Sequence, residues 1–193
     1  MSFSSRKDPK VILAVDVPNL DMITMRVTGE RPIPANRPKY DVLKEFFEKR
    51  YPNADMLAAA FSNIRPDNYA SVLGWAENFL RPAGYGVLLK PKRNTDDDID
   101  EDIINWIDGL VNNPAFEIKN VVVVSHDSAR FDGYFEKLQE QHIATTYAAF
   151  SEHLSCNPGL NTEIVDLRDI PGMPVDLWPD RRFEKIPDSG LWV

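Results

Sequence analysis

Three groups of acidic and amide side chains in this sequence could bind a divalent cation. Asp16 and Asn19 follow a short apolar run, Asp127 follows a run of four valines, and acids crowd residues 96–102. In an open α/β sheet the ligand site lies beyond the carboxyl ends of the strands, which would bring the three groups to one edge. Carboxylates gathered there repel one another unless a cation lies between them, and hard cations such as Mg²⁺ take oxygen ligands. The sequence therefore predicts a site for Mg²⁺ or Mn²⁺.

Asp100 is the preferred ligand from the acidic run. The run leads into a predicted helix whose apolar face, at about 100° per residue, includes Ile103. Asp96 and Asp100 fall on that face, whereas Asp98 and Asp102 flank it. A buried carboxylate without a partner is costly, and a cation at the sheet edge would account for both inward-facing acids. Asp100 is preferred because it lies one helical turn deeper.

Helix capping and turns offer a simpler explanation for each acidic group. Thr95 and Asp98 resemble a capping box, which places the helix start near Asp96, and acids suit the positive end of a helix dipole. Asp16 could form an Asx-type turn, and Asp127 could cap the next helix. For a single residue these explanations are sufficient. The joint placement of the three groups favours the metal.

Length and composition indicate one α/β domain without a membrane span. The chain has 193 residues and a net charge of −8. This charge argues against a protein that binds nucleic acid over a broad basic surface, but not against one that binds it at a local site. It has no run of about 18 apolar residues, and its N-terminus lacks the apolar segment of a secretory signal. The single Cys156 excludes an internal disulfide and is expected to be a structural thiol. We expect a cytoplasmic protein.

Apolar runs alternate with helical patterns along the chain, which predicts a three-layer α/β/α, Rossmann-like fold with a mostly parallel sheet. Strands are expected at residues 11–15, 56–61, 85–89, 121–124 and 143–148, with a short one at 164–167, and helices at 40–50, 66–80, from 96 onward and at 128–141. Residues 1–9 are expected to be a flexible N-terminus and residues 10–168 the domain. Residues 169–193 form a proline-rich extension that we expect to pack on the body or on a partner.

A group of basic residues is a local exception in this acidic chain. Residues 24–39 contain glycine and prolines and are predicted to form a long loop, which carries Arg26, Arg31 and Arg37. Three further basic residues precede the acidic run: Lys90, Lys92 and Arg93. All six are expected to contact nucleic-acid phosphates. For the second group, a solvated connector is the alternative.

Three motifs occur in an order that resembles a known family. They are Val15-Asp16-Val17-Pro18-Asn19-Leu20, then Lys90 leading to Ile99-Asp100, then Val123-Val124-Ser125-His126-Asp127-Ser128. Over roughly residues 11–150 the set resembles the NYN domains, which belong to the PIN-like metal-dependent ribonucleases. The resemblance implies a PIN-type fold and RNA as substrate. Single-stranded RNA is expected because an isolated basic loop on an acidic body offers no long positive surface for a duplex.

The resemblance also implies roles for individual residues. Asp16, Asp100 and Asp127 would hold the Mg²⁺ or Mn²⁺, and Asn19 would orient a water or a phosphate oxygen. The supporting residues are Asp96, Asp98, Asp102, Ser125, His126 and Asp132. His126 could donate to the scissile phosphate as a general acid, or it could be a turn residue whose ring is satisfied.

The motifs depart from the family pattern at several positions. Val17 and His126 replace glycines, Arg130 stands in a stretch that usually carries an acid and a phenylalanine, and Trp106 replaces an acid that Asp132 could supply. A catalytically weak, RNA-binding or regulatory member of the family is therefore the alternative function. A metal-dependent phosphatase is a third, weakened because Pro18 stands where such a site needs a second aspartate. We expect no membrane partner and leave a homodimer open.

Overall fold

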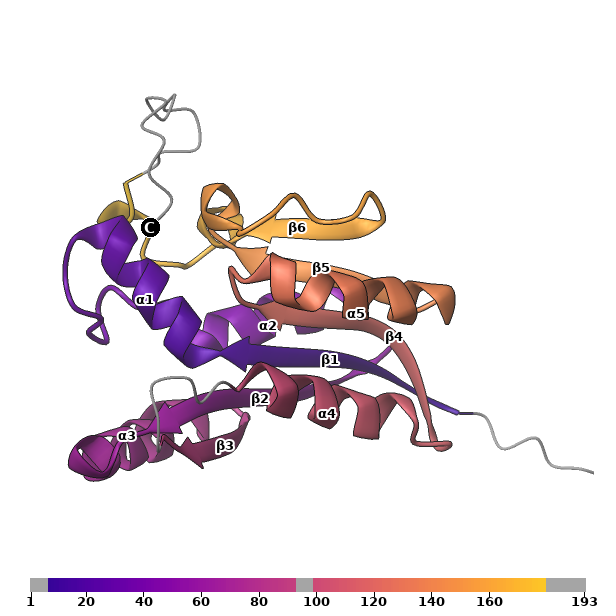
Figure 1. The fold of residues 1–193 in the computed structure, drawn as a ribbon, viewed down its shortest axis with the longest axis horizontal. Helices are drawn as coiled ribbons and strands as arrows, with labels where there is room; N and C mark the ends of the chain where they lie inside the picture. The colour runs from indigo at the N-terminus through magenta and orange to yellow at the C-terminus, as the bar shows by residue number, and fades with distance from the viewer. Residues whose placement is uncertain (1–6, 93–98, 180–193) are drawn as a thin grey trace, which may run out of the picture.

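A computed structural model describes residues 7–92 and 99–179 of the chain. Within these residues one all-parallel sheet has the strand order β3-β2-β1-β4-β5-β6. The strands are β1 Asp8–Asp16, β2 Asp55–Ile64, β3 Gly86–Pro91, β4 Phe116–Val124, β5 Ala144–Ala149 and β6 Thr162–Asp166. The α-helices are α1 Val17–Thr28, α2 Tyr40–Arg50, α3 Tyr69–Trp75, α4 Asp100–Val111 and α5 Ser128–Glu140. The predicted three-layer α/β fold is confirmed (Figure 1).

The central strand β1 separates two apolar cores. Side chains of a strand alternate between the two faces of a sheet, so the continuous apolar run of β1 faces both ways. Val11, Leu13 and Val15 belong to the core that α1 and α2 cover. Ile12 and Ala14 belong to the core that α4 and α5 cover. The same alternation directs Asp16, the last residue of β1, toward α4 and α5.

Helix α1 occupies part of the segment for which the sequence predicted a loop. Its buried residues Val17, Leu20, Ile23 and Val27 have helical spacing, and Pro18 is tolerated because it lies in the first turn. Gly29 ends the helix with a φ of 74° and donates its N–H to the carbonyl of Met25 at 2.8 Å. The predicted loop was therefore wrong for residues 24–28, whereas residues 29–39 form no helix or strand, as predicted.

The remaining predicted elements differ from the structure mainly at their ends. The helix predicted at residues 66–80 is divided into the 3-10 turn Pro66–Asn68, α3 and the π-helical turn Ala76–Leu80. In the π-helical turn Arg81 donates its N–H to the carbonyl of Ala76 at 3.0 Å. Helix α4 has Ile99 as its N-cap. The predicted helix start near Asp96 falls within residues 93–98, outside the described residues.

Residues 169–179 pack against the body. Ile170, Met173 and Trp178 are buried in the core beneath α1 and α2. The indole N–H of Trp178 donates to the carbonyl of Asn36 at 2.8 Å. The segment after β6 is thereby joined to the connection between α1 and α2.

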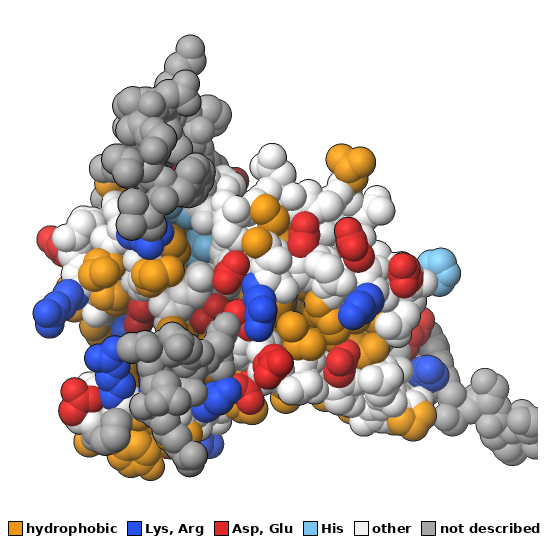
Figure 2. Space-filling model, viewed as in Figure 1, with side chains coloured by type: hydrophobic (Ala, Val, Ile, Leu, Met, Phe, Trp, Pro, Cys, Tyr) orange, Lys and Arg blue, Asp and Glu red, His pale blue; other side chains and the backbone are white. Residues whose placement is uncertain are grey.

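Charged side chains of both signs are interspersed on the face that α4 and α5 cover (Figure 2). No continuous basic surface is visible among the described residues on this face. In the part of the chain that the structure describes, no helix has the length and apolar character needed to cross a membrane.

Candidate active site at the carboxyl edge of the sheet

Asp16 is a nearly buried carboxylate at the end of the central strand. It is 4% exposed and caps α1 by accepting the N–H of Asn19 through Oδ1 at 3.1 Å. Its Oδ2 accepts the hydroxyl of Ser125, which follows β4, at 3.0 Å. The local turn that the sequence analysis offered as the simpler explanation for Asp16 is therefore present. It does not exclude a metal, because each carboxylate oxygen has a second lone pair.

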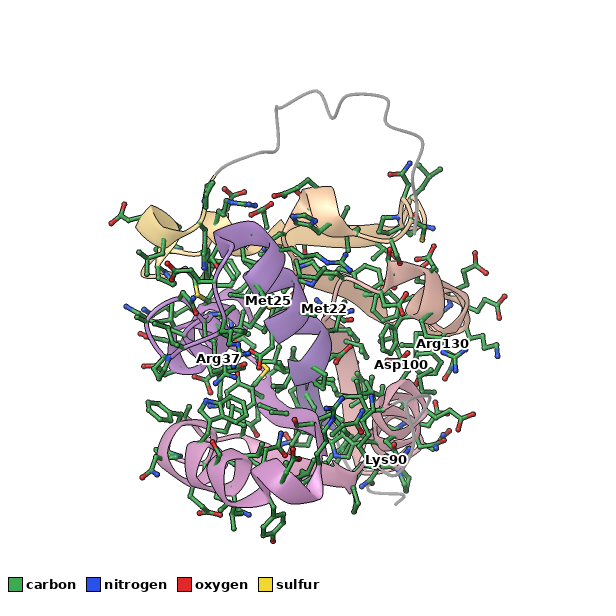
Figure 3. All side chains as sticks on the ribbon, turned by 60° about the vertical axis from the view of Figure 1, so that its left-hand side comes forward. Met22, Met25, Arg37, Lys90, Asp100 and Arg130 are labelled. Carbon is green, nitrogen blue, oxygen red and sulfur yellow. The ribbon has the colours of Figure 1, made fainter. Side chains whose placement is uncertain are left out.

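Asp100 is a second nearly buried carboxylate, at the first residue of α4. It is 4% exposed and lies on the helix face that also buries Ile103 and Ile107. The Nε of Arg130, on α5, lies 3.6 Å from Asp100 Oδ2. Figure 3 shows the two residues side by side. The separation is longer than a normal hydrogen bond, so the contact is a weak ion pair with a half-exposed arginine.

The topology places Asp16 and Asp100 at the same edge and on the same side of the sheet. Helix α4 precedes β4 and runs antiparallel to it, so its first residue lies at the carboxyl edge (Figure 1). Asp16 faces α4 and α5 by the alternation of β1. This edge includes the point where the chain order reverses between β1 and β4, which is where ligands bind in open parallel sheets.

Asp127 is held by a partner that the sequence analysis missed. Its side chain makes no capping bond to α5 and instead accepts the hydroxyl of Ser155 through Oδ1 at 3.1 Å. Ser155 Oγ in turn accepts the N–H of Ala129 at 2.9 Å and so takes over the capping. Ser155 lies 28 residues beyond Asp127, in the β5–β6 connection, and no local pattern predicts it.

The described residues do not assemble a three-carboxylate centre. Among residues 7–92 and 99–179, no three His, Cys, Asp or Glu side chains are placed to hold one ion. Asp102 is paired with Lys90 at 2.7 Å, and Asp132 lies 3.9 Å from the sulfur of Cys156. Asp96 and Asp98 lie outside the described residues. Asp16 and Asp100 are each 4% exposed, so they are the predicted ligands that most need a compensating charge, whereas the role of the half-buried Asp127 as a third ligand stays a prediction.

The buried His126 and the half-buried Asn19 link the turns that follow β1 and β4. Asn19 Oδ1 accepts the backbone N–H of His126 at 2.8 Å and lies 3.0 Å from its Nδ1. His126 Nε2 accepts the N–H of Phe150 at 3.0 Å, which assigns the ring proton to Nδ1. Burial is the main cause that lowers the pKa of His126 to about 3. His126 is therefore neutral at physiological pH and is a satisfied structural residue rather than a general acid.

The predicted phosphate-binding residues have different surroundings. Arg37 donates from Nε to Asp21 Oδ1 at 2.8 Å and from Nη2 to Asp21 Oδ2, and its guanidinium lies 4.9 Å from the centre of the Trp75 ring. Arg26, which lies on α1, and Arg31, beyond it, are exposed. Arg37 and Lys90 are therefore engaged by carboxylates, Lys92 is half-buried, and Arg93 is outside the described residues.

Asp21 is an acid that the sequence analysis missed. Burial raises its pKa more than the Arg37 guanidinium lowers it. Recognising α1 in the sequence would have placed Asp21 on a helix that follows the candidate ligand Asp16. Its pairing with Arg37 depends on the return of the chain after Gly29, which no helical pattern predicts.

Comparisons with known proteins support the fold alone. No protein-family model matches the chain, and no curated protein matches it. A solved structure of a protein of unknown function from Vibrio parahaemolyticus RIMD 2210633 is similar, with a TM-score of 0.58 and 19% sequence identity over 86% of this chain and 97% of that chain. The resemblance to the NYN domains stays a prediction from the sequence motifs.

Proposed function

We propose that this protein is a metal-dependent ribonuclease that cleaves single-stranded RNA at the carboxyl edge of its sheet. The placement of Asp16 and Asp100 supports this proposal: both carboxylates are 4% exposed and belong to the same side of the same edge. Burying two carboxylates near each other is costly unless positive charge compensates them. Mg²⁺ is commonly bound through one or two carboxylates, several waters and substrate phosphates, so this donor set fits it.

The surrounding residues have distinct roles in the proposed reaction. A bound Mg²⁺ or Mn²⁺ would activate water and stabilise charge on the phosphate. Asp16 and Asp100 would hold the ion, and the hydrogen bond from Ser125 fixes the Asp16 carboxylate. The amide NH₂ group of Asn19 would orient a phosphate oxygen, because its carbonyl oxygen is already engaged by His126. We further propose that the protein acts in the cytoplasm.

An RNA-binding module without catalysis is the second candidate. It is favoured by the contact between Arg130 and Asp100, because the guanidinium supplies positive charge where the ribonuclease needs a metal. In this alternative the arginine, 53% exposed at its side chain, binds a phosphate and no bond is broken.

Calorimetric titration with Mn²⁺ tests the metal site directly. Asp16→Asn and Asp100→Asn should each weaken Mn²⁺ binding by about tenfold or more, because each variant removes one of the two proposed carboxylate ligands. Asp102→Asn is the matched control, because Asp102 lies on the same helix but is 44% exposed at its side chain and paired with Lys90. Parent-like binding by both variants would refute the site.

Cleavage of a labelled RNA separates the two candidate functions. The parent should cleave single-stranded RNA with Mn²⁺, lose the activity with EDTA and regain it with excess Mn²⁺. Asp16→Asn should lose cleavage but keep RNA binding. RNA binding without cleavage by the parent, across several sequences, would favour the binding module instead. Equal cleavage by the parent and Asp16→Asn would identify a contaminating nuclease.

A further inference from the structure

A cavity of about 410 Å³ lies beside α1, away from the carboxylates. It is lined by the start of α2, by α3 and by the π-helical turn, and its aromatic, basic and amide side chains are Trp75, Phe79, Arg37, Lys39 and Asn78. Figure 3 shows Arg37 on one side of α1 and Asp100 on the other. Helix α1 therefore lies between Arg37, which lines the cavity, and Asp100, although no residue of α1 lines the cavity itself.

Trp75, in the aromatic wall of this cavity, is contacted by Arg37 and by Tyr40. Two hydrogen bonds to Asp21 hold the Arg37 guanidinium against the Trp75 ring. On another side, the Trp75 ring meets the edge of Tyr40 at a centroid distance of 5.6 Å. A ring fixed in this way loses little conformational freedom when a ligand binds. The arginine thus positions the tryptophan ring. Its Nε and Nη2 groups are already used by Asp21.

The mouth of the cavity carries an exposed aromatic side chain on an unusual helical turn. Phe79 is 49% exposed and, with Asn78, belongs to the π-helical turn Ala76–Leu80. Turns of this kind are rare and occur frequently at functional sites. Asn78 is exposed and donates one amide hydrogen to the carbonyl of Gly74, which leaves its oxygen for another partner. An exposed phenylalanine beside an amide and a fixed tryptophan is suited to a flat polar ring.

Two features of the cavity favour a nucleotide over other flat ligands. Lys39 is exposed at the N-cap position of α2, where the helix dipole attracts anions. The volume accommodates a single nucleobase with its sugar, and base stacking on aromatic side chains is the usual way in which proteins hold single-stranded nucleic acid. A proline-rich peptide also binds aromatic grooves but needs no cation at this position.

We propose that this cavity binds one unstacked nucleobase of a single-stranded RNA, with the base on Phe79 and a flanking phosphate on Lys39. The inference deepens the proposed ribonuclease function, because α1 separates the cavity from Asp16 and one RNA strand crossing α1 would reach both. Arg37, which lines the cavity, is bonded to Asp21 on α1, the helix that Asp16 caps.

Fluorescence anisotropy of a labelled single-stranded RNA in EDTA measures this subsite without cleavage. Phe79→Ala should weaken binding roughly 5- to 100-fold, the range for loss of one stacked base. Tyr69→Ala is the matched control, because Tyr69, the first residue of α3, is 54% exposed and does not line the cavity. Phe79→Trp should retain affinity, whereas Phe79→Leu should lose it. Lys39→Gln should lower the slope of log affinity against log salt by about 0.7.

The outcomes separate failure of the subsite from failure of the proposed function. RNA binding that depends on Phe79 in a parent without nuclease activity would retain the subsite and remove the ribonuclease. Cleavage with the same KM in the parent and Phe79→Ala would retain the ribonuclease and overturn the subsite. An equal loss of affinity in Phe79→Ala and Tyr69→Ala would overturn the subsite, as would a parent that binds no RNA. Binding of a proline-rich peptide that Phe79→Ala abolishes would also overturn it.

Discussion

The charge balance around Asp100 decides between the two candidate functions. Asp100 is almost fully buried, whereas Arg130, its partner at 3.6 Å, is half-exposed and belongs to a different helix. An ion pair of this kind contributes little net energy, because the exposed partner remains hydrated. Arg130 can therefore be displaced by a tighter cation at modest cost. Its charge nevertheless opposes the binding of a metal to the same carboxylate.

Removing that competing charge should strengthen metal binding. Arg130→Gln is expected to increase Mn²⁺ affinity roughly threefold to tenfold, because a partly exposed charge pair is worth about 1 kcal/mol. Isothermal titration calorimetry at constant ionic strength measures the change. Arg81→Gln is the control, because Arg81 is similarly exposed and pairs with Glu77 rather than with a predicted metal ligand. Unchanged affinity in Arg130→Gln would show that the arginine does not compete with the metal, and weaker affinity would show that it supports the site.

The buried His126 should make stability depend on pH. Its pKa falls from 6.5 to about 3 in the folded protein, mainly through burial, so the unfolded chain takes up a proton that the folded protein refuses. The free energy of unfolding should then decrease as pH falls from about 6.5 toward 3, by up to about 1.4 kcal/mol per unit. Above pH 6.5 this contribution is complete and constant.

Urea unfolding between pH 7.5 and 4.5 measures this dependence. His126→Gln should be less stable than the parent at pH 7.5, because two hydrogen bonds are altered, but its stability should fall less steeply with acid. His142→Asn is the control: His142 is exposed and has a φ of 62°, which asparagine tolerates. If the free energy of unfolding depended equally steeply on pH in the parent and in His126→Gln, the assignment of a neutral His126 ring would be contradicted.

At the scale of elements, the sequence predicts strands more reliably than the segments that join them. The strands of this sheet are buried on both faces, so their continuous apolar runs are distinctive. Helix α1 was missed because Gly29 and the prolines beyond it indicated a loop from residue 24, although the apolar spacing of residues 17–27 is helical. The π-helical turn Ala76–Leu80 has no local signature, because it depends on packing of Ala76 and Leu80 in the core.

Two glycines on helices should respond to alanine with opposite signs. Gly29 ends α1 with a φ of 74°, where an alanine costs about 1 to 2 kcal/mol although the added Cβ would meet no other side chain or backbone atom within 4 Å. Gly133 lies within α5 and likewise has open space where a Cβ would stand, so alanine should stabilise the protein by about 0.5 to 1 kcal/mol. Thermal unfolding of both variants measures the difference. A loss of stability in Gly133→Ala would reveal a need for glycine within α5.

The candidate site combines features that the sequence predicts with features that it does not. Parallel topology makes the carboxyl ends of β1 and β4 neighbours, and helical periodicity turns Asp100 inward, so both placements follow from local patterns. The partners that hold the side chains of Asp127 and Asp21 do not follow from local patterns. Ser155 reaches Asp127 across 28 residues and Arg37 reaches Asp21 across 16, and both separations are closed by turns whose geometry local residue types do not determine.

At the scale of the whole molecule, the distribution of charge bears on how RNA could bind. Exposed positive charge is sparse near α1, which the proposed RNA strand crosses. The chain carries a net charge of −8, and the acidic and basic side chains visible in Figure 2 are interspersed. Arg26 on α1 and Arg31 beyond Gly29 are exposed, and neither is joined to a carboxylate by an ion pair in the described residues. Two isolated cations suit a flexible single strand better than a long duplex.

Replacing both arginines should weaken RNA binding in a salt-dependent way. Each phosphate contact to a single strand contributes about 0.7 to the slope of log affinity against log salt, so the double variant Arg26→Ala/Arg31→Ala should lower the slope by about 1.4. Anisotropy of labelled RNA in EDTA, from low to moderate salt, gives this slope without cleavage. Lys49→Ala/Arg81→Ala is the control, because both residues are exposed and pair with glutamates on their own helical segments. If both double variants lowered the slope equally, general charge rather than contacts near α1 would govern binding. The slope reports how many counterions the RNA releases when its phosphates are neutralised by basic side chains. If Arg26 and Arg31 bind phosphates, removing both must reduce that number. An unchanged slope in Arg26→Ala/Arg31→Ala would therefore place the RNA elsewhere.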